Sequence, residues 1–466
     1  MKSAKRYFRL LSMMAFSLLI ISCEDNDEIT AEENEDLKEA SSEDSEVLTA
    51  WIYEVMRNYY YWNEDIAPPA SAEADPEDYF YSLLVPEDQF SFITDDYQEL
   101  IDAFTGVYRT VGYSPTFGLL EANQVFIVVE YVYPGSPADR AGLRRGDIIL
   151  EIDGQPMDTT NYFERYSQEQ YTATLGDFTG TGIASTDRQV DLTAEVVATD
   201  PVLYTEVKEY GTTRVGYLVY TEFITGDNQQ WLGSLDTALD EFGQESVEEL
   251  IVDLRYNPGG EIEPAERLAS AIAPPSAVAS EEVLVRYEYN PGLEAAIEVT
   301  EGAESESLVS RLSDQGQNLN LDRVVFLTSS GTASASELLI NGLEPYMDVI
   351  IVGEPTVGKF YGSWIIPDLE DSARHDWAVS PVVLKYANAD GVTDFDDGLL
   401  PDYEIADNLL DAYPFGDEGD PVLAQALSLV TPDFNSRTLT VTDKVRPYQY
   451  LKNPENDQIL TIPKPF

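Results

Sequence analysis

The chain has 466 residues, of which 86 are acidic and 27 are basic, and its formal net charge is −59 at pH 7. This length predicts about three domains. The apolar content of 43% is enough for packed cores, which excludes wholesale disorder. Binding a polyanion needs clustered lysine and arginine, and this chain lacks such clusters, so we do not expect nucleic acid as a partner.

The N-terminus has the pattern of a bacterial export signal. Residues 1–9 contain four basic side chains, and residues 10–21 form an apolar run of signal-peptide length. The run ends in Ile-Ile-Ser-Cys at Cys23, which resembles the lipobox of bacterial lipoproteins. This resemblance implies that residues 1–22 are a signal peptide and that a lipidated Cys23 anchors the protein in the cell envelope. The alternative is an ordinary export signal with a chance cysteine. Cys23 is the only cysteine, which excludes an internal disulfide or a cysteine-based metal site.

Two regions follow the expected anchor. Residues 23–47 are acidic and poor in apolar residues, which predicts a flexible tether. Acidic runs directly after the lipidated cysteine resemble those of some Bacteroidetes lipoproteins, so we expect an outer-membrane location on the periplasmic or the outer face. From residue 48 onward, aromatic and apolar residues such as Trp51 and Tyr59 recur at helical spacing. We interpret residues 48–105 as a small helical domain that carries no chemistry.

Residues 106–200 have a different, β-rich pattern. A solid apolar run at residues 125–129 predicts a strand, and residues 147–152 predict another that enters an Asp-Gly turn. The string GSPADRAGLRRGDIILEIDGQPM at residues 135–157 resembles the PDZ domains of bacterial proteases. Residues 162–187 have no counterpart in that family that we can place.

The resemblance to PDZ domains also implies a peptide-binding site. The carboxylate-binding loop of the family corresponds here to Thr116, Phe117, Gly118 and Leu119. Exposed backbone N–H groups in such a loop can hold a C-terminal carboxylate while an edge strand pairs with the peptide. The alternative for these four residues is a structural β-turn.

Residues 201–432 alternate between apolar strands and amphipathic helices. Solid apolar runs at residues 250–254, 324–327 and 349–352 predict buried strands, and residues 231–242 and 264–272 predict helices. Such alternation predicts a largely parallel sheet that is covered on both faces. Functional side chains on such sheets lie where strands end and loops begin.

Three strand ends in this region carry candidate chemistry. Residues 253–260, DLRYNPGG, end a strand in a Pro-Gly-Gly turn, where glycines let the backbone approach a ligand. Residues 332–337, TASASE, place Ser334 at the start of a helix, and residues 353–359, GEPTVGK, place Lys359 after the next strand. Taken alone, a serine at a helix N-terminus is more commonly a capping residue.

Together and in this order, the three segments resemble the C-terminal processing peptidases, which are also called tail-specific peptidases. The spacing of Ser334 and Lys359 fits the Ser–Lys dyad of that family. The resemblance implies that Ala335 and either Gly259 or Gly260 form the backbone oxyanion hole. Family members commonly have a glutamine four residues after the lysine, where this chain has Ser363, so Ser363 becomes a candidate for orienting Lys359. The implied fold is multidomain α/β: the helical domain, the PDZ-like domain and a catalytic core of the crotonase-like, C-terminal processing peptidase type.

The chemistry of the dyad sets conditions on its surroundings. A lysine amine can take the proton of a serine hydroxyl only if burial depresses the pKa of the amine. A contacting carboxylate would keep the amine charged, so we predict that no acidic side chain contacts the Lys359 amine. Glu337 lies one turn into the helix, where we favour an interaction with the helix dipole over a supporting role behind the site.

Competing mechanisms can be judged by counting residues. His375 is the only histidine and lies in a polar segment, so we interpret it as a surface residue and not as a triad member. Zinc peptidase motifs need two histidines and are excluded. No metal or other cofactor is expected.

The combined prediction is a lipid-anchored serine endopeptidase that cleaves polypeptides recognised through C-terminal or unfolded segments. One alternative is a peptide-binding lipoprotein that keeps the fold without the activity, which the missing glutamine makes conceivable. Another is a carbohydrate-handling surface lipoprotein, suggested by the acidic tether and the aromatic content. We interpret residues 433–466 as a polar C-terminal tail.

Overall fold

The computed structural model describes residues 31–66, 75–120, 123–179, 182–368, 375–431, 434 and 449–450. The predicted signal peptide and Cys23 lie outside the described residues. No helix in the described part of the chain is both long enough and apolar enough to cross a membrane.

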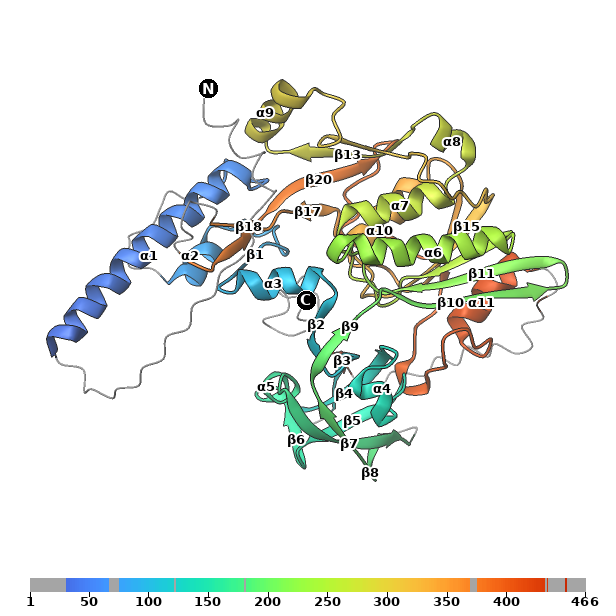
Figure 1. Ribbon diagram of the computed structural model, residues 1–466, viewed down its shortest axis with the longest axis horizontal. Coiled ribbons are helices and arrows are strands. Elements are labelled where there is room, and N and C mark those ends of the chain that lie inside the picture. The colour runs from blue at the N-terminus through green and yellow to red at the C-terminus, as the bar shows by residue number, and fades with distance from the viewer. Residues whose placement is uncertain are drawn as a thin grey trace.

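The N-terminal region is mainly helical, as predicted, and packs against the catalytic core. Its elements are α1 (Ala31–Tyr59), α2 (Pro76–Ser82), β1 (Phe92–Thr94) and α3 (Tyr97–Phe104). Helix α1 extends away from the body of the molecule (Figure 1). The prediction of a flexible tether is therefore wrong for residues 31–47, which form the first part of α1. The physical reason is that this acidic stretch contains six glutamates and two alanines, which are good helix formers.

A β-rich unit follows, placed at the bottom of Figure 1. Its elements are β2 (Val107–Thr110), β3 (Tyr113–Leu119), β4 (Gln124–Val132), α4 (Pro137–Ala141), β5 (Ile148–Ile152), β6 (Gln155–Asp158), α5 (Tyr162–Tyr166), β7 (Gln170–Phe178), β8 (Ile183–Thr193) and β9 (Glu195–Ala198). Strands β3 to β8 form one sheet in the order β3-β4-β6-β5-β7-β8. Residues 162–187, which had no counterpart, supply α5, β7 and the start of β8.

The structure corrects the expected carboxylate-binding loop. Thr116 to Leu119 lie inside strand β3, where Phe117 pairs with Ile127 of β4. The turn that precedes β3 contains Gly112, whose φ is +87° and which leaves no room for a Cβ beside Ser136. Residues 116–119 form part of a strand because β3 pairs with the apolar strand β4 along the whole length of β3.

The catalytic core is built on a six-stranded sheet in the order β10-β11-β12-β15-β16-β21. The strands are β10 (Val202–Tyr210), β11 (Thr213–Tyr220), β12 (Glu249–Asp253), β15 (Arg323–Thr328), β16 (Asp348–Gly353) and β21 (Tyr403–Glu404). All neighbours from β11 to β21 pair in parallel, and only β10 is antiparallel. The predicted, largely parallel sheet is thus confirmed.

Helices cover both faces of this sheet. One face packs against α6 (Gln230–Gln244), α7 (Ile262–Ile272) and α10 (Ala335–Leu343), and the other against α11 (Pro421–Val430) (Figure 1). Each face of the sheet has its own hydrophobic core, and alternate residues of one strand contribute to the two cores. Leu250 packs into the core on the first face and Ile251 into the core on the second. This burial on both faces explains why the strands read as solid apolar runs.

Two smaller sheets join the core to the N-terminal region. The first contains β14 (Val309–Arg311), β13 (Val283–Tyr289), β20 (Val382–Asn388) and β17 (Tyr361–Ser363) in that order. The second places β1 beside β19 (Ala378–Ser380), which pairs with β18 (Ile366–Pro367). The remaining elements are α8 (Pro275–Ala279), α9 (Pro291–Glu301), the short helices η3 (Asp227–Gln229) and η4 (Leu409–Asp411), and β22 (Gln449–Tyr450).

Candidate active site

The site is assembled at the carboxyl ends of three neighbouring parallel strands. Strand β12 leads into the Pro-Gly-Gly turn, β15 into the turn before α10, and β16 into the loop that carries Lys359. Backbone hydrogen bonds join the three segments: Ala333 N–H donates to Asn257 O at 3.2 Å and Val357 N–H donates to Thr332 O at 2.9 Å. Loops at this edge of a parallel sheet are where functional residues are expected to meet.

Ser334 occupies a strained turn immediately before helix α10. Its φ is +56° and its ψ is −114°, a conformation that non-glycine residues rarely adopt. Such a conformation costs about 1–3 kcal/mol and persists only where the surroundings impose it. The turn leaves Ser334 half-buried on the wall of a cavity while its neighbour Ala335 is buried.

Glu337 holds the backbone of both candidate dyad residues. One carboxylate oxygen, Oε2, accepts the N–H groups of Ser334 and Lys359, each at 2.8 Å. The other, Oε1, accepts the Thr356 hydroxyl at 2.5 Å and the Gly358 N–H at 2.7 Å. Burial raises the pKa of Glu337, although these four donors act in the opposite direction. The favoured interpretation as a dipole partner alone is therefore too narrow, because the contacts place Glu337 behind the site as its support.

Lys359 has the depressed basicity that proton transfer requires. Desolvation lowers the pKa of its ammonium to about 8, against the attraction of the Glu337 and Asp88 carboxylates. Its Nζ lies 5.3 Å from the centre of the Phe90 ring. Among the described residues, no carboxylate forms an ion pair with Nζ, and Glu337 meets Lys359 only at its backbone N–H.

Ser334 and Lys359 line the same cavity, which has a volume of about 590 Å³. Tyr386 spans the two residues, because its hydroxyl lies 3.3 Å from Ser334 O and 3.4 Å from Lys359 O. No hydrogen bond joins Ser334 Oγ directly to Lys359 Nζ within the described residues. Catalytic hydrogen bonds are commonly long without substrate and shorten in the substrate complex.

The backbone near Ser334 offers donors for an oxyanion. A Cβ at Gly259 would lie 2.7 Å from Ser334 Cβ and 2.9 Å from Ala335 N, so only glycine permits this close approach. The Gly259 N–H already donates to Asn257 Oδ1 at 2.9 Å. Within the described part of the chain, the N–H groups of Gly260 and Ala335 have no acceptor. Of the two candidate glycines, Gly260 is therefore the one whose N–H group is available to an oxyanion.

Two sequence-based expectations about nearby side chains are wrong. Ser363 lines the cavity, but its Oγ is buried without a hydrogen-bond partner in the described chain, so it does not hold Lys359 here. His375 is not a surface residue: its side chain is only 12% exposed and its ring packs on Trp51 of α1 with the centroids 4.7 Å apart. The helical region packs over this segment, which a local polar pattern does not reveal. His375 is also absent from the cavity lining.

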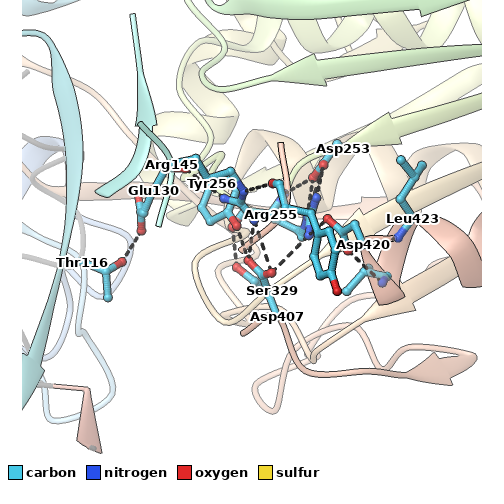
Figure 2. A network of polar contacts seen from close by, with 12 residues as sticks. Thr116, Glu130, Arg145, Asp253, Arg255, Tyr256, Ser329, Asp407, Asp420 and Leu423 are labelled. Atoms are coloured by element: carbon cyan, nitrogen blue, oxygen red, sulfur yellow. Dashed lines mark hydrogen bonds and ion pairs between the residues drawn. The ribbon is translucent and has the colours of Figure 1, made fainter. Parts of the chain in front are cut away.

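A buried ionic cluster surrounds Arg255, which lies three residues before the Pro-Gly-Gly turn (Figure 2). Arg255 is fully buried and pairs with Asp253 at 2.7 Å, with Asp420 at 2.9 Å and with Asp407 at 3.2 Å. Burial by itself would raise the pKa of Asp407, but the guanidiniums of Arg255 and Arg145 outweigh it and lower this pKa. The local sequence around Arg255 gave no sign of the whole cluster, because two of its partners, Asp407 and Asp420, come from segments more than 150 residues later.

The same cluster connects the PDZ-like unit to the core. Arg145 precedes β5 and pairs with Asp407 at 3.3 Å, while its guanidinium also lies 4.8 Å from the Tyr256 ring centre. Its Nη1 donates to Glu130 O at 2.9 Å, and the Glu130 carboxylate accepts the Thr116 hydroxyl (Figure 2). The same carboxylate also accepts the Ser114 hydroxyl. A continuous set of polar contacts thus runs from strand β3 to the turn beside Ser334.

Comparison with known proteins places the chain in a family. Residues 214–405 match peptidase family S41, residues 128–170 match a PDZ domain, and residues 48–92 match the peptidase S41 N-terminal domain. With the fold and the site described above, residues 214–405 are a domain of peptidase family S41. The predicted family and fold class are confirmed.

Individual relatives agree with this placement. The carboxyl-terminal-processing protease of Picosynechococcus sp. is 27% identical over 361 residues, which cover 77% of each chain. The carboxy-terminal processing protease of Bacillus subtilis is 25% identical over 303 residues, which cover 62% of this chain and 57% of that relative. A crystal structure of a candidate S41 protease from Bacteroides fragilis superimposes with a TM-score of 0.67 and 27% identity, over 81% of this chain and 96% of that chain.

Proposed function

We propose that the protein is a serine peptidase of the C-terminal processing type, with Ser334 as nucleophile and Lys359 as general base. The observation that carries the proposal is the joint fixation of both residues by one carboxylate. Glu337 holds the two backbones at the wall of one cavity, with Lys359 desolvated and Ser334 in a strained turn. Structural neighbours alone would support the fold without this chemistry.

The proposed reaction proceeds through an acyl-enzyme. Neutral Lys359 Nζ takes the proton of Ser334 Oγ as Oγ attacks the carbonyl carbon of the scissile peptide bond. The N–H groups of Ala335 and Gly260 stabilise the negative oxygen of the tetrahedral intermediate. The C–N bond then breaks, the proton passes from Lys359 to the leaving amine, and an ester joins the acyl group to Ser334. A water molecule, deprotonated by Lys359, hydrolyses this ester and restores the serine.

The proposed substrates are polypeptides with C-terminal or unfolded segments. The cavity wall is mainly apolar and aromatic, and Phe90, Ile101, Phe104, Leu338 and Trp364 belong to it. Such a wall suits apolar side chains next to the scissile bond. We also propose that Cys23 anchors the protein to the outer membrane, in line with the lipobox-like sequence.

The primary test is cleavage of an unfolded, labelled polypeptide by the purified mature chain that begins at Cys23. We expect cleavage by the parent protein and none by a Lys359→Met variant, which keeps the length of the side chain but has no base. Circular dichroism of both proteins controls for folding. Binding of the polypeptide without cleavage by the parent would favour the alternative of an inactive peptide-binding protein.

The pH dependence of cleavage tests the role of Lys359. Below its pKa of about 8 the ammonium has no lone pair to accept the serine proton. We therefore expect kcat/KM to rise about tenfold per pH unit below pH 8 and to level off above it. The profile would be measured between pH 5.5 and 9.5 at constant ionic strength. A plateau that already begins near pH 6 would contradict the assignment of Lys359 as the base.

Glu337→Gln tests the supporting role of the carboxylate. A glutamine keeps one acceptor oxygen and replaces the other with an NH₂ group, which is a donor. In one orientation the NH₂ faces the N–H groups of Ser334 and Lys359, and in the other it faces the Thr356 hydroxyl and the Gly358 N–H, so the backbone of Ser334 and Lys359 or that of Gly358, next to Lys359, must shift. We expect kcat to fall by about 10²-fold, because displacements of about 1 Å have effects of this size. The KM should change little, since Glu337 does not face the cavity. The matched control is Glu344→Gln at the other end of α10, which should retain the parent kcat.

A further inference from the structure

The outer edge of strand β3 is occupied by the C-terminal tail. Strand β3 pairs with β4 on one side, and on its other side it pairs with β22 (Gln449–Tyr450). An edge strand presents a row of backbone N–H and C=O groups that can pair with any extended segment. In this chain the segment that takes the edge comes from the chain itself.

The register gives the direction of the added strand. Gln449 lies opposite Leu119 and Tyr450 lies opposite Gly118, and the pairing is antiparallel. From Gln449 to Tyr450, β22 therefore runs from the level of Leu119 to that of Gly118. Peptides that add a strand to an exposed sheet edge use this main-chain pairing for affinity.

Helix α5 lies beside the same strand. The Phe117 ring of β3 contacts Tyr162 at 4.9 Å and Tyr166 at 5.5 Å between ring centres. Strand β3 therefore combines a backbone edge, where β22 pairs, with an aromatic contact between its Phe117 side chain and α5. A surface of this kind can select the side chains of the segment that pairs with it.

Charge favours the tail as the occupant. The PDZ-like region, residues 106–200, has 14 acidic and 6 basic residues. Residues 444–452, which contain β22, have three basic residues and no acidic one. The whole tail, residues 435–466, has five basic and three acidic residues in a chain whose net charge is −59. A basic segment is therefore attracted to an acidic domain, while most other segments of this chain would be repelled.

We propose that the tail segment centred on Gln449–Tyr450 is an intramolecular ligand of strand β3, which a polypeptide substrate must displace before the PDZ-like domain can bind it. The part of this inference that concerns substrates rests on the proposed function. The pairing of β22 with β3 does not depend on that function. Tethering makes even a weak ligand effective, because a ligand within the same chain can have an effective concentration on the order of millimolar. Substrate segments that pair with β3 less well than the tail would be excluded.

The test uses the mature full-length chain and a fluorescein-labelled peptide with the sequence of residues 444–456. The variant Gln449→Pro/Tyr450→Pro removes both backbone N–H groups of β22 and breaks the pairing. We expect this variant to bind the peptide about 10-fold more tightly than the parent does, measured by fluorescence anisotropy, because the tethered competitor is gone. The matched control Asn456→Pro/Asp457→Pro changes the same tail outside β22 and should bind the peptide as the parent does.

Hydrogen exchange locates the effect. Exchange of the backbone amides in residues 113–119, followed by mass spectrometry, should be faster in the Gln449→Pro/Tyr450→Pro variant than in the parent and the control. Equal peptide affinity in the three proteins, or no peptide binding to any of them, would overturn the proposal. Tighter peptide binding without faster exchange in residues 113–119 would overturn it too, since the tail would then lie elsewhere.

Cleavage assays separate this inference from the proposed function. If the enzyme is active, the Gln449→Pro/Tyr450→Pro variant should cleave an unfolded polypeptide with a kcat/KM several-fold above that of the parent. If no variant cleaves, the proposed function fails, while the anisotropy and exchange results still decide whether the tail occupies β3.

Discussion

Ser334→Ala is expected to abolish cleavage of an unfolded polypeptide while the fold remains intact. Loss of the nucleophile in serine peptidases lowers kcat by about 10⁶-fold, and we expect at least about 10⁴-fold here. The fold should survive because Ser334 is only half-buried and lines the cavity. Single-turnover cleavage assays, with thermal melting as a check on folding, would measure both quantities.

A matched control distinguishes the nucleophile from neighbouring hydroxyls. Ser330 precedes the strained turn and is exposed to solvent, so Ser330→Ala should keep the parent kcat. Substantial cleavage that survives in Ser334→Ala would rule out Ser334 as the nucleophile, and with it the proposed acyl-enzyme.

Arg255→Met is expected to have the largest effect on stability of any single substitution that we consider. The side chain is 0% exposed and pairs with Asp253, Asp407 and Asp420. Removing it leaves buried carboxylates without their main counter-charge, for which the usual loss is about 3–5 kcal/mol in the free energy of unfolding. Arg255 lies two residues before Asn257, which accepts the Gly259 N–H, so cleavage should also fall.

The control for Arg255 is an arginine of the same sheet with a more exposed partner. Arg323 of β15 makes a two-point contact with Glu249, and its side chain is 31% exposed. Arg323→Met should therefore cost less than about 1 kcal/mol. Urea unfolding followed by the fluorescence of the catalytic core would compare the two variants. Equal losses of stability would show that the buried cluster around Arg255 contributes no more than a surface pair.

The architecture of the core could be predicted because its signals are local. Strands such as β12 and β15 are buried on both faces and therefore read as unbroken apolar runs, and a parallel sheet gathers their carboxyl ends at one edge. The order of the Pro-Gly-Gly turn, Ser334 and Lys359 along the chain therefore already indicated that they meet. Turns and helix starts can be predicted from the sequence because each depends on the types of only a few neighbouring residues.

Other features depend on contacts between distant segments, which no local pattern contains. Glu337 lies 22 residues from Lys359 and receives its backbone N–H, and Phe90 of the N-terminal region covers Lys359 Nζ. The same holds for His375, whose polar surroundings in sequence suggested exposure, whereas α1 packs over it. In each case the contact or the burial of the residue depends on an element that is distant in the chain.

By itself, the amino-acid sequence determined the class of fold, the family and the two candidate catalytic residues of this protein, because periodicity and strand-end motifs are properties of short stretches. Only the tertiary structure decided how these residues are held. It placed Glu337 behind both, left Ser363 without a bond to Lys359, and brought β22 to the edge of β3. The physical reason is that desolvation, backbone support and strand pairing arise from the approach of distant segments, which becomes definite only when the chain has folded.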